Sequence, residues 1–343
     1  MDDDPWGGFE EEVDEITIHD DDGMGKDEAV GHKFKRRDDK GFRIDEGLSE
    51  VSKAIRFLRE SKLPTQIRCG VCMVRRCLDE GVGAADVDLL SALENLLVVR
   101  AKHSPTLQVL AGEALSGAGP VGALSAGAVL PLMRTCKHLL ASPNEGVVEA
   151  WARVFEGAVV GHAAAESLRD EARPLLLWLG ESGRAWHQRR EGGVLVASVC
   201  ERLSAEDAMG VPKGMESRPK AERVSIVHRA LALCQDTDHR VRLAMAAQLP
   251  RLARAFGGGW GLMGSVCEEL VELVRDEEAS VRGSALAAVC EMARHAPPPS
   301  RDALARAAEG SFRLFALEAH EGAHQRAHAD MLCQHCGPLL AAL

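Results

Sequence analysis

Histidines and cysteines gather near the C-terminal end of the chain at spacings that suit a metal ion. Three histidines follow one another at intervals of four residues, which places them on one face of a helix, and a Cys-x-x-Cys pair comes next. These zinc candidates are His320, His324, His328, Cys333 and Cys336. Because the same stretch also has the pattern of an ordinary last repeat, the sequence favours a structural helix, and no cofactor is predicted.

A second Cys-x-x-Cys motif is Cys69-Gly-Val-Cys72, which is followed by Cys77. The two cysteines are one helical turn apart within an apolar helical pattern, so they are predicted to be a buried core pair. The other cysteines are scattered in similar apolar patterns, which is typical of proteins in a reducing compartment.

Acidic residues, the usual general acids and bases, cluster at 276–278. They occupy a polar break between apolar runs, so we expect a solvent-facing turn in which nothing raises a carboxyl pKa. No Gly-x-Ser-x-Gly elbow occurs, and "FGGGWG" at 256–261 lacks the Lys and Ser/Thr of a phosphate-binding loop. The sequence therefore predicts neither an enzyme nor a small-molecule substrate.

The acidic turn has a copy forty residues earlier. "DTDHRVR" (236–242) and "DEEASVR" (276–282) both begin with Asp, end with Val-Arg and lie between apolar runs. Comparable positions recur along the chain at about the same spacing. They are Ile67, Leu107, Val147, His187, Val241, Val281 and Ala323. One step is longer by fourteen residues, which fits a Pro/Gly-rich insertion at about 209–220.

A forty-residue period with apolar residues at three-to-four spacing is typical of HEAT repeats, in which stacked helical hairpins bury their apolar faces jointly. The sequence therefore predicts an all-α, armadillo-like α-solenoid of about seven repeats over residues 46–343. The repeated turn would then be the joint of each hairpin, with Asp as helix cap, Val in the core and Arg reaching the next repeat. Asp236, Arg242, Asp276 and Arg282 are predicted to form this ladder, or alternatively to face a partner.

Three tryptophans, Trp151, Trp178 and Trp186, fall in or beside helices of the middle repeats. Core packing is the expectation for each, and any that is exposed becomes a candidate anchor for a protein partner.

The charge is concentrated in the first 46 residues, which carry 7 basic and 17 acidic residues, a balance of −10. The rest of the chain carries 34 basic and 35 acidic residues, a balance of −1, so that the whole has −11. Residues 1–45 are predicted to be a largely disordered acidic leader. The near-neutral body argues against nucleic-acid binding. No signal peptide and no run of about eighteen apolar residues occurs, so a cytosolic or nuclear protein with no membrane span is expected.

Several stretches in order resemble HEAT-repeat regulatory subunits of protein phosphatases. They are "FEEEVDEITI", "DEGLSEVSKAIRFL", "NEGVVEAW", "SVCERL", "LCQDTDHRVRLAMAAQLPRLARAFG" and "ELVELVRDEEASVRGSALAAV". The resemblance is closest to the family of serine/threonine-protein phosphatase 4 regulatory subunit 4. It implies a cytoplasmic, non-catalytic scaffold that binds a type 2A-like serine/threonine phosphatase catalytic subunit. Members are usually longer, and no phosphatase-contacting residue can be transferred.

Two other functions are kept as alternatives. The first is an importin-like transport solenoid, which usually has a strongly acidic concave face, unlike this near-neutral body. The second is a zinc-binding protein that uses the C-terminal His/Cys cluster.

Overall fold

The fold is taken from a computed structural model of the chain. It describes residues 47–81, 85–117, 124–210, 224–256, 260–293, 301–306 and 308–310. Every regular element within these ranges is helical, and no strand occurs among them, so the prediction of an all-α fold is confirmed. No helix in these ranges is long and apolar enough to cross a bilayer. The acidic leader, most of the Pro/Gly-rich insertion and the C-terminal His/Cys cluster lie outside the described residues.

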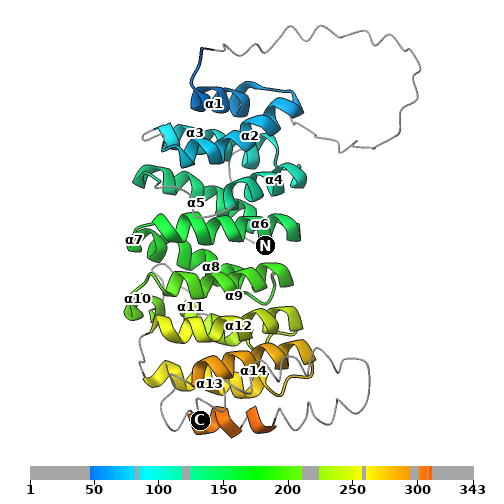
Figure 1. The fold of residues 1–343 in the computed structure, drawn as a ribbon, viewed down its shortest axis with the longest axis vertical. Helices are drawn as coiled ribbons and strands as arrows, with labels where there is room; N and C mark the ends of the chain where they lie inside the picture. Colours follow the sequence, from blue (N-terminus) through cyan, green and yellow to red (C-terminus); the bar gives the residue numbers. More distant parts are fainter. Residues whose placement is uncertain are drawn as a thin grey trace, which may run out of the picture. The chain divides into compact units, whose positions relative to one another are not determined.

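The helices divide into two compact units between His162 and Ala163. In the first unit, α1 packs on α2, the α3–η1 helix leads into α4, and α5 packs on α6, which makes three hairpins (Figure 1). Its helices are α1 (Glu50–Glu60), α2 (Pro64–Asp79), α3 (Ala85–Glu94), η1 (Asn95–Arg100), α4 (Pro105–Ser116), α5 (Ala126–Leu140), α6 (Glu145–Val154) and η2 (Phe155–Val160). The second helices of successive hairpins stack on one another, α2 on α4 and α4 on α6.

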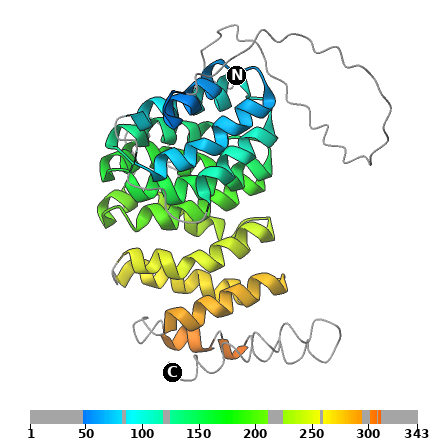
Figure 2. The same ribbon diagram turned by 45° about the horizontal axis from the view of Figure 1, so that its top comes forward.

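The second unit repeats this arrangement. The pairs α8–α9, α11–α12 and α13–α14 form its hairpins, and α12 packs between α9 and α14 (Figure 2). Its helices are α7 (Ala165–Ser167), η3 (Leu168–Ala172), α8 (Arg173–Leu179), α9 (Trp186–Cys200), α10 (Ala205–Met209), α11 (Ile226–Leu233), α12 (His239–Ala255), α13 (Trp260–Leu273) and α14 (Ala279–Ala293). The short α10 lies in the longer step of the repeat. Stacked hairpins throughout the described residues are the architecture of an α-solenoid.

The forty-residue landmarks fall within one residue of the same place in every described hairpin. Each of the six described ones lies in the first turn of the second helix and is at most 7% exposed. They are Ile67, Leu107, Val147, His187, Val241 and Val281, while Ala323 lies outside the described residues. Leu107, Val147, Val241 and Val281 are each the third residue of their helix. His187 is the second residue of α9, so the equivalent position there is Gln188, and the predicted landmark is wrong by one residue.

Local signals set where these second helices begin. Pro64 and Pro105 each occupy the first position of a helix, where proline loses no hydrogen bond because that N–H has no helical partner. Asn144 caps α6 by accepting a hydrogen bond from the N–H of Val147 at 3.1 Å. The breaks seen in the sequence are therefore the turns within the hairpins.

An arginine of the second hairpin binds the C-terminal carbonyls of α1 in the first hairpin. Arg100 donates to the carbonyls of Leu58, Arg59 and Ser61, at the end of α1. Burial lowers the pKa of Arg100. These contacts satisfy carbonyls that have no partner within their own helix, so they fix the spacing of successive hairpins.

Candidate partner-binding surface

The repeated acidic turn forms ion pairs between successive hairpins of the second unit. Arg242, on α12, makes a bidentate pair with Asp276: Nε lies 2.7 Å from Oδ2, and Nη2 lies 2.9 Å from Oδ1. Both side chains are at most 10% exposed. Burial alone would raise the pKa of Asp276, but the hydrogen bonds from Arg242 and from the N–H of Glu278 lower it overall. A carboxyl group held ionised in this way is unsuited to act as a general acid at neutral pH.

The ladder also contains Arg189, which the sequence analysis missed. Its guanidinium makes a bidentate pair with Asp236, with both N–O distances 2.7 Å. Arg189, Arg242 and Arg282 are each the fourth residue of their helix, and each donates from Nη1 to carbonyls of the preceding turn. Arg189 could have been found from the Trp-x-x-Arg start of α9 had the landmark been placed one residue later.

Neither predicted aspartate occupies the N-cap position of the following helix. The N-cap of α12 is Asp238, whose carboxylate accepts from the N–H of Arg240 at 2.9 Å. Asp236 instead accepts from the N–H of Asp238, and Asp276 accepts from the N–H of Glu278, also at 2.9 Å. Each ladder aspartate thus organises the turn before the helix while it binds the arginine of the preceding hairpin.

In the first unit the same joint position is held by Gln108. It is the fourth residue of α4, and its Nε2 donates to the carbonyls of Leu97 and Lys102 at 3.1 and 3.2 Å. The carbonyl of Gln108 accepts from the indole N–H of the fully buried Trp151 at 2.8 Å. In this hairpin a neutral amide makes the carbonyl contacts that arginine makes in the second unit, whereas the fourth residues of α2 and α6 are the apolar Ile67 and Val148.

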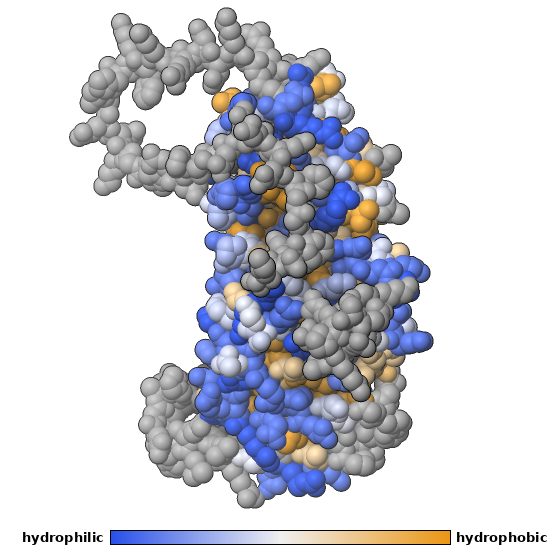
Figure 3. Space-filling model, turned by 180° about the vertical axis from the view of Figure 1, so that it is seen from behind, coloured by the Kyte–Doolittle hydropathy of each residue, from blue (hydrophilic) through white to orange (hydrophobic). Residues whose placement is uncertain are grey.

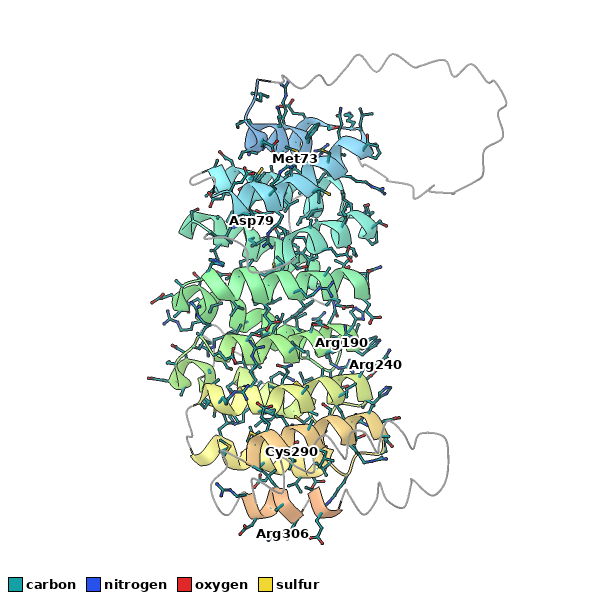
Figure 4. All side chains as sticks on the ribbon, viewed as in Figure 1. Met73, Asp79, Arg190, Arg240, Cys290 and Arg306 are labelled. Atoms are coloured by element: carbon teal, nitrogen blue, oxygen red, sulfur yellow. The ribbon has the colours of Figure 1, made fainter. Side chains whose placement is uncertain are left out.

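Of Trp151, Trp178 and Trp186, it is Trp186 that combines partial exposure with charged neighbours from two hairpins. It begins α9, and the Arg240 guanidinium of α12 lies 3.3 Å from its ring centroid. Arg190 lies 5.1 Å from the same centroid, and Figure 4 shows Arg190 and Arg240 side by side on their two helices. The arginine contacts are in the range of favourable cation–π interactions. We call Trp186, Arg190 and Arg240 the tryptophan–arginine cluster.

Hydrogen bonds hold Arg240 in this position. Its Nε and Nη2 lie 3.0 and 2.8 Å from the two carboxylate oxygens of Asp238, the helix cap. The hydrogen bond and charge of Arg240 lower the pKa of Asp238 to about 2, against the opposing effect of burial. Arg240 remains 45% exposed, so its outer face is available to a partner.

The other exposed features of the described residues are dispersed. Trp178 is partly exposed and carries the Arg184 guanidinium 3.8 Å from its ring centroid. The exposed large apolar side chains are Leu63, Val99, Leu130 and Met209. On the face in Figure 3, hydrophobic residues appear in several areas between hydrophilic ones. Single apolar side chains of this kind are normal on protein surfaces and indicate no particular partner.

The metal predictions have two different outcomes. The candidates His320, His324, His328, Cys333 and Cys336 lie outside the described residues. Among the described residues, no group of three or more His, Cys, Asp or Glu side chains is placed to hold a metal ion.

The prediction that Cys69 and Cys72 are a buried core pair is wrong, because both are exposed on α2, whereas Cys77 is buried as expected. Cysteine was counted as apolar in the helical pattern, yet α2 faces its neighbours with Val71 and Val74 instead.

Comparisons with known proteins identify the fold. No protein-family model and no curated protein matches the chain. Among solved structures, a chain of the Kap95:Nup1 complex matches with a TM-score of 0.54 and 11% identity over 85% of this chain. A Kap95p complex with RanGDP matches with 10% identity over 85% of this chain and a TM-score of 0.49.

This chain spans only 36% of the length of each of these Kap95 chains. A designed armadillo repeat protein in complex with the peptide (KR)4 is 16% identical over 86% of this chain and 99% of its own length, with a TM-score of 0.37. The match to the Kap95:Nup1 chain supports the same conclusion as the hairpin stacking, namely that the fold is a HEAT/armadillo-type helical solenoid.

Proposed function

We propose that the protein is a non-catalytic regulatory scaffold in the cytoplasm that binds a type 2A-like serine/threonine phosphatase catalytic subunit, phosphatase 4 in particular. Stacked hairpins present a repetitive surface suited to binding another protein. The choice of partner comes from the ordered sequence stretches that resemble phosphatase 4 regulatory subunits. The solenoid fold supports the broader part of the proposal, that the chain binds a protein.

The observation that carries the proposed binding surface is the tryptophan–arginine cluster. Tryptophan and arginine are the residue types enriched among interface side chains whose loss costs the most binding energy. Here both types are held in place before binding, because Trp186 stacks under Arg240 and Arg240 is fixed by Asp238. A surface ordered in advance loses less conformational entropy when a partner docks. We therefore assign the cluster as the contact of the second unit with the phosphatase.

A pull-down and a titration of the purified chain with phosphatase 4 catalytic subunit test the proposal. Trp186→Ala and Arg240→Ala should each weaken binding at least about tenfold. Arg254→Ala is a matched control, since Arg254 is an exposed arginine of the same helix, pairs with Glu291 and lies outside the cluster. Absence of any association, with helicity intact, would overturn the assignment of partner. Binding that survives both cluster substitutions would overturn the assignment of surface.

The importin-like alternative has in its favour a fold likeness to Kap95, whose solved complexes include Nup1 and RanGDP. The same assay distinguishes it when a Ran-type GTPase replaces the phosphatase. Association with the GTPase and not with the phosphatase would favour the transport function. Stoichiometric zinc that is lost on substitution of Cys333 and Cys336 would favour the zinc-binding alternative.

A further inference from the structure

The exposed pair Cys69 and Cys72 shares one face of α2 with a third sulfur atom. Met73 is four residues after Cys69, and its Sδ lies 4.0 Å from the Sγ of Cys69. Residues at i, i+3 and i+4 form a triangle on a helix surface, with neighbouring Cβ atoms about 5–6 Å apart. Figure 4 shows Met73 on this helix. Two thiols and one thioether are thus gathered within a single turn.

The packing of α2 fixes the direction in which these sulfurs face. Gly70, between the cysteines, lies against α1 so closely that a Cβ there would be 2.7 Å from the Cβ of Phe57. Val71 and Val74 are each 1% exposed. Because these residues hold the inner face of α2, Cys69 and Cys72 point outward, whereas Met73 is 8% exposed and lies at the border of the buried face. The sulfur cluster is therefore carried at the edge of the packed side of a rigid element.

We propose that Cys69, Cys72 and Met73 bind one monovalent copper ion through three sulfur atoms. A metal–sulfur bond of about 2.3 Å places two sulfurs of one ion about 3.8–4.0 Å apart, which is the separation seen between Cys69 and Met73. Cys72 is three residues after Cys69 on the same helix, where neighbouring Cβ atoms are about 5–6 Å apart, so its thiol is within reach of the same ion. In the binding step, Cu(I) replaces one proton on each thiol, two protons go to solvent, and no electron is transferred.

The donor set selects copper over zinc. Thiolate and thioether sulfurs are soft ligands that favour Cu(I), whereas structural zinc sites use four Cys or His ligands. Such a set is not formed here, because no group of three or more His, Cys, Asp or Glu side chains gathers among the described residues. The bound ion with two thiolates carries one net negative charge.

The other described cysteines are unsuited to this chemistry. Six of them are buried, Cys77, Cys136, Cys200, Cys234, Cys267 and Cys290. Burial raises the pKa of the Cys136 and Cys234 thiols and raises that of Cys200 to about 12, so that the thiolate needed for metal binding is disfavoured. Copper binding by the described part of the chain is therefore expected at α2.

The test is an anaerobic Cu(I) titration of the reduced full-length chain against a chromophoric Cu(I) chelator. Cys333→Ser and Cys336→Ser are introduced throughout, so that the other Cys-x-x-Cys pair cannot contribute. One Cu(I) per chain is expected, with an affinity that falls at least about 100-fold in Cys69→Ser or Cys72→Ser and about tenfold in Met73→Leu. Cys77→Ala, on the same helix but buried, is the matched control and should leave the affinity unchanged.

Circular dichroism establishes that each variant keeps its helicity. Failure of the starting chain to retain Cu(I), or unchanged affinity after Cys69→Ser and Cys72→Ser, would overturn the site. Unchanged affinity in Met73→Leu would overturn the three-sulfur arrangement, and tighter binding of Zn(II) than of Cu(I) would overturn the choice of metal.

Discussion

At the joints of the second unit, each of three aspartates orders a turn or the start of a helix and also binds an arginine. Both contacts depend on a charged carboxylate. Asp238 caps α12 and orients Arg240 over Trp186, while Asp236 and Asp276 order the turns and bind arginines of the preceding hairpin. An ionised carboxylate accepts several hydrogen bonds at once, which an amide or hydroxyl does less well. Stability and surface geometry at these joints should therefore depend on the same protonation states.

Asp238→Ala should lower the free energy of unfolding of the second unit by about 1 kcal/mol at pH 7, because a helix cap is lost. The pKa of Asp238 in the folded protein is about 2, below its ordinary value of 3.8. A depressed pKa contributes stability that is present above about pH 4 and is lost as pH falls toward 2. Urea unfolding from pH 7 to pH 2 checks this: the difference between wild type and variant should vanish at the acid end. A difference that stays constant with pH would contradict the assigned pKa.

Arg242→Ala should destabilise the second unit by about 3 kcal/mol, because it leaves the buried carboxylate of Asp276 without its partner. The double variant Arg242→Met with Asp276→Leu should lose much less, since apolar side chains of similar volume can replace a buried pair. Arg254→Ala, which breaks the exposed pair with Glu291, is the control and should cost under about 1 kcal/mol. Chemical denaturation measures these losses. If Arg242→Ala and Arg254→Ala lowered the free energy of unfolding equally, burial of the Arg242–Asp276 pair would add nothing to its effect on stability.

At the scale of helices and hairpins, the forty-residue spacing was a better guide to the structure than the type of individual residues. The forty-residue spacing located the first turn of the second helix in every described hairpin, because each repeat buries an apolar residue there. The landmark in α9 was misplaced by one residue, since the stretch before α9 has Ser-Gly-Arg where the later repeats have an acidic turn. The orientation of Cys69 and Cys72 was wrong because it depends on how closely α1 approaches Gly70, which no spacing rule contains. The tryptophan–arginine cluster could not be found from sequence, as its members come from separate hairpins.

Replacing a helical glycine by alanine usually stabilises the helix, but the effect reverses where a neighbouring helix lies too close for a Cβ atom. A Cβ on Gly112 of α4 would lie 2.8 Å from the Cβ of Ala150 and 3.2 Å from its carbonyl carbon in α6. Gly112→Ala should therefore destabilise the first unit by about 1–3 kcal/mol, although alanine is the better helix former. At Gly157 of η2, no atom lies within 4 Å of such a Cβ, so Gly157→Ala should instead stabilise by up to about 1 kcal/mol. Thermal unfolding of both variants checks the opposite signs, and shifts in the same direction would contradict the α4–α6 contact.

For the whole molecule, the uneven charge predicts how association responds to salt. Removing residues 1–46 changes the net charge from −11 to −1 while leaving every described helix in place. Long-range electrostatics act mainly on the association rate and are screened beyond about 10 Å at 0.1 M salt. The truncated chain should therefore bind its partner with an association rate that varies much less with salt concentration than that of the full chain. Its dissociation rate should be unchanged, because the contact residues remain.

A full-length variant separates charge from chain length in that experiment. Asp20, Asp21 and Asp22 replaced together by Asn remove three of the ten net negative charges of the leader without shortening it. If the leader acts through its charge, this variant should show about three tenths of the change in salt dependence that truncation produces. Stopped-flow association at several salt concentrations measures both. A full effect of truncation with no effect of the substitutions would mean that the leader contacts the partner through its apolar residues, and a steeper salt dependence after truncation would contradict the electrostatic role itself.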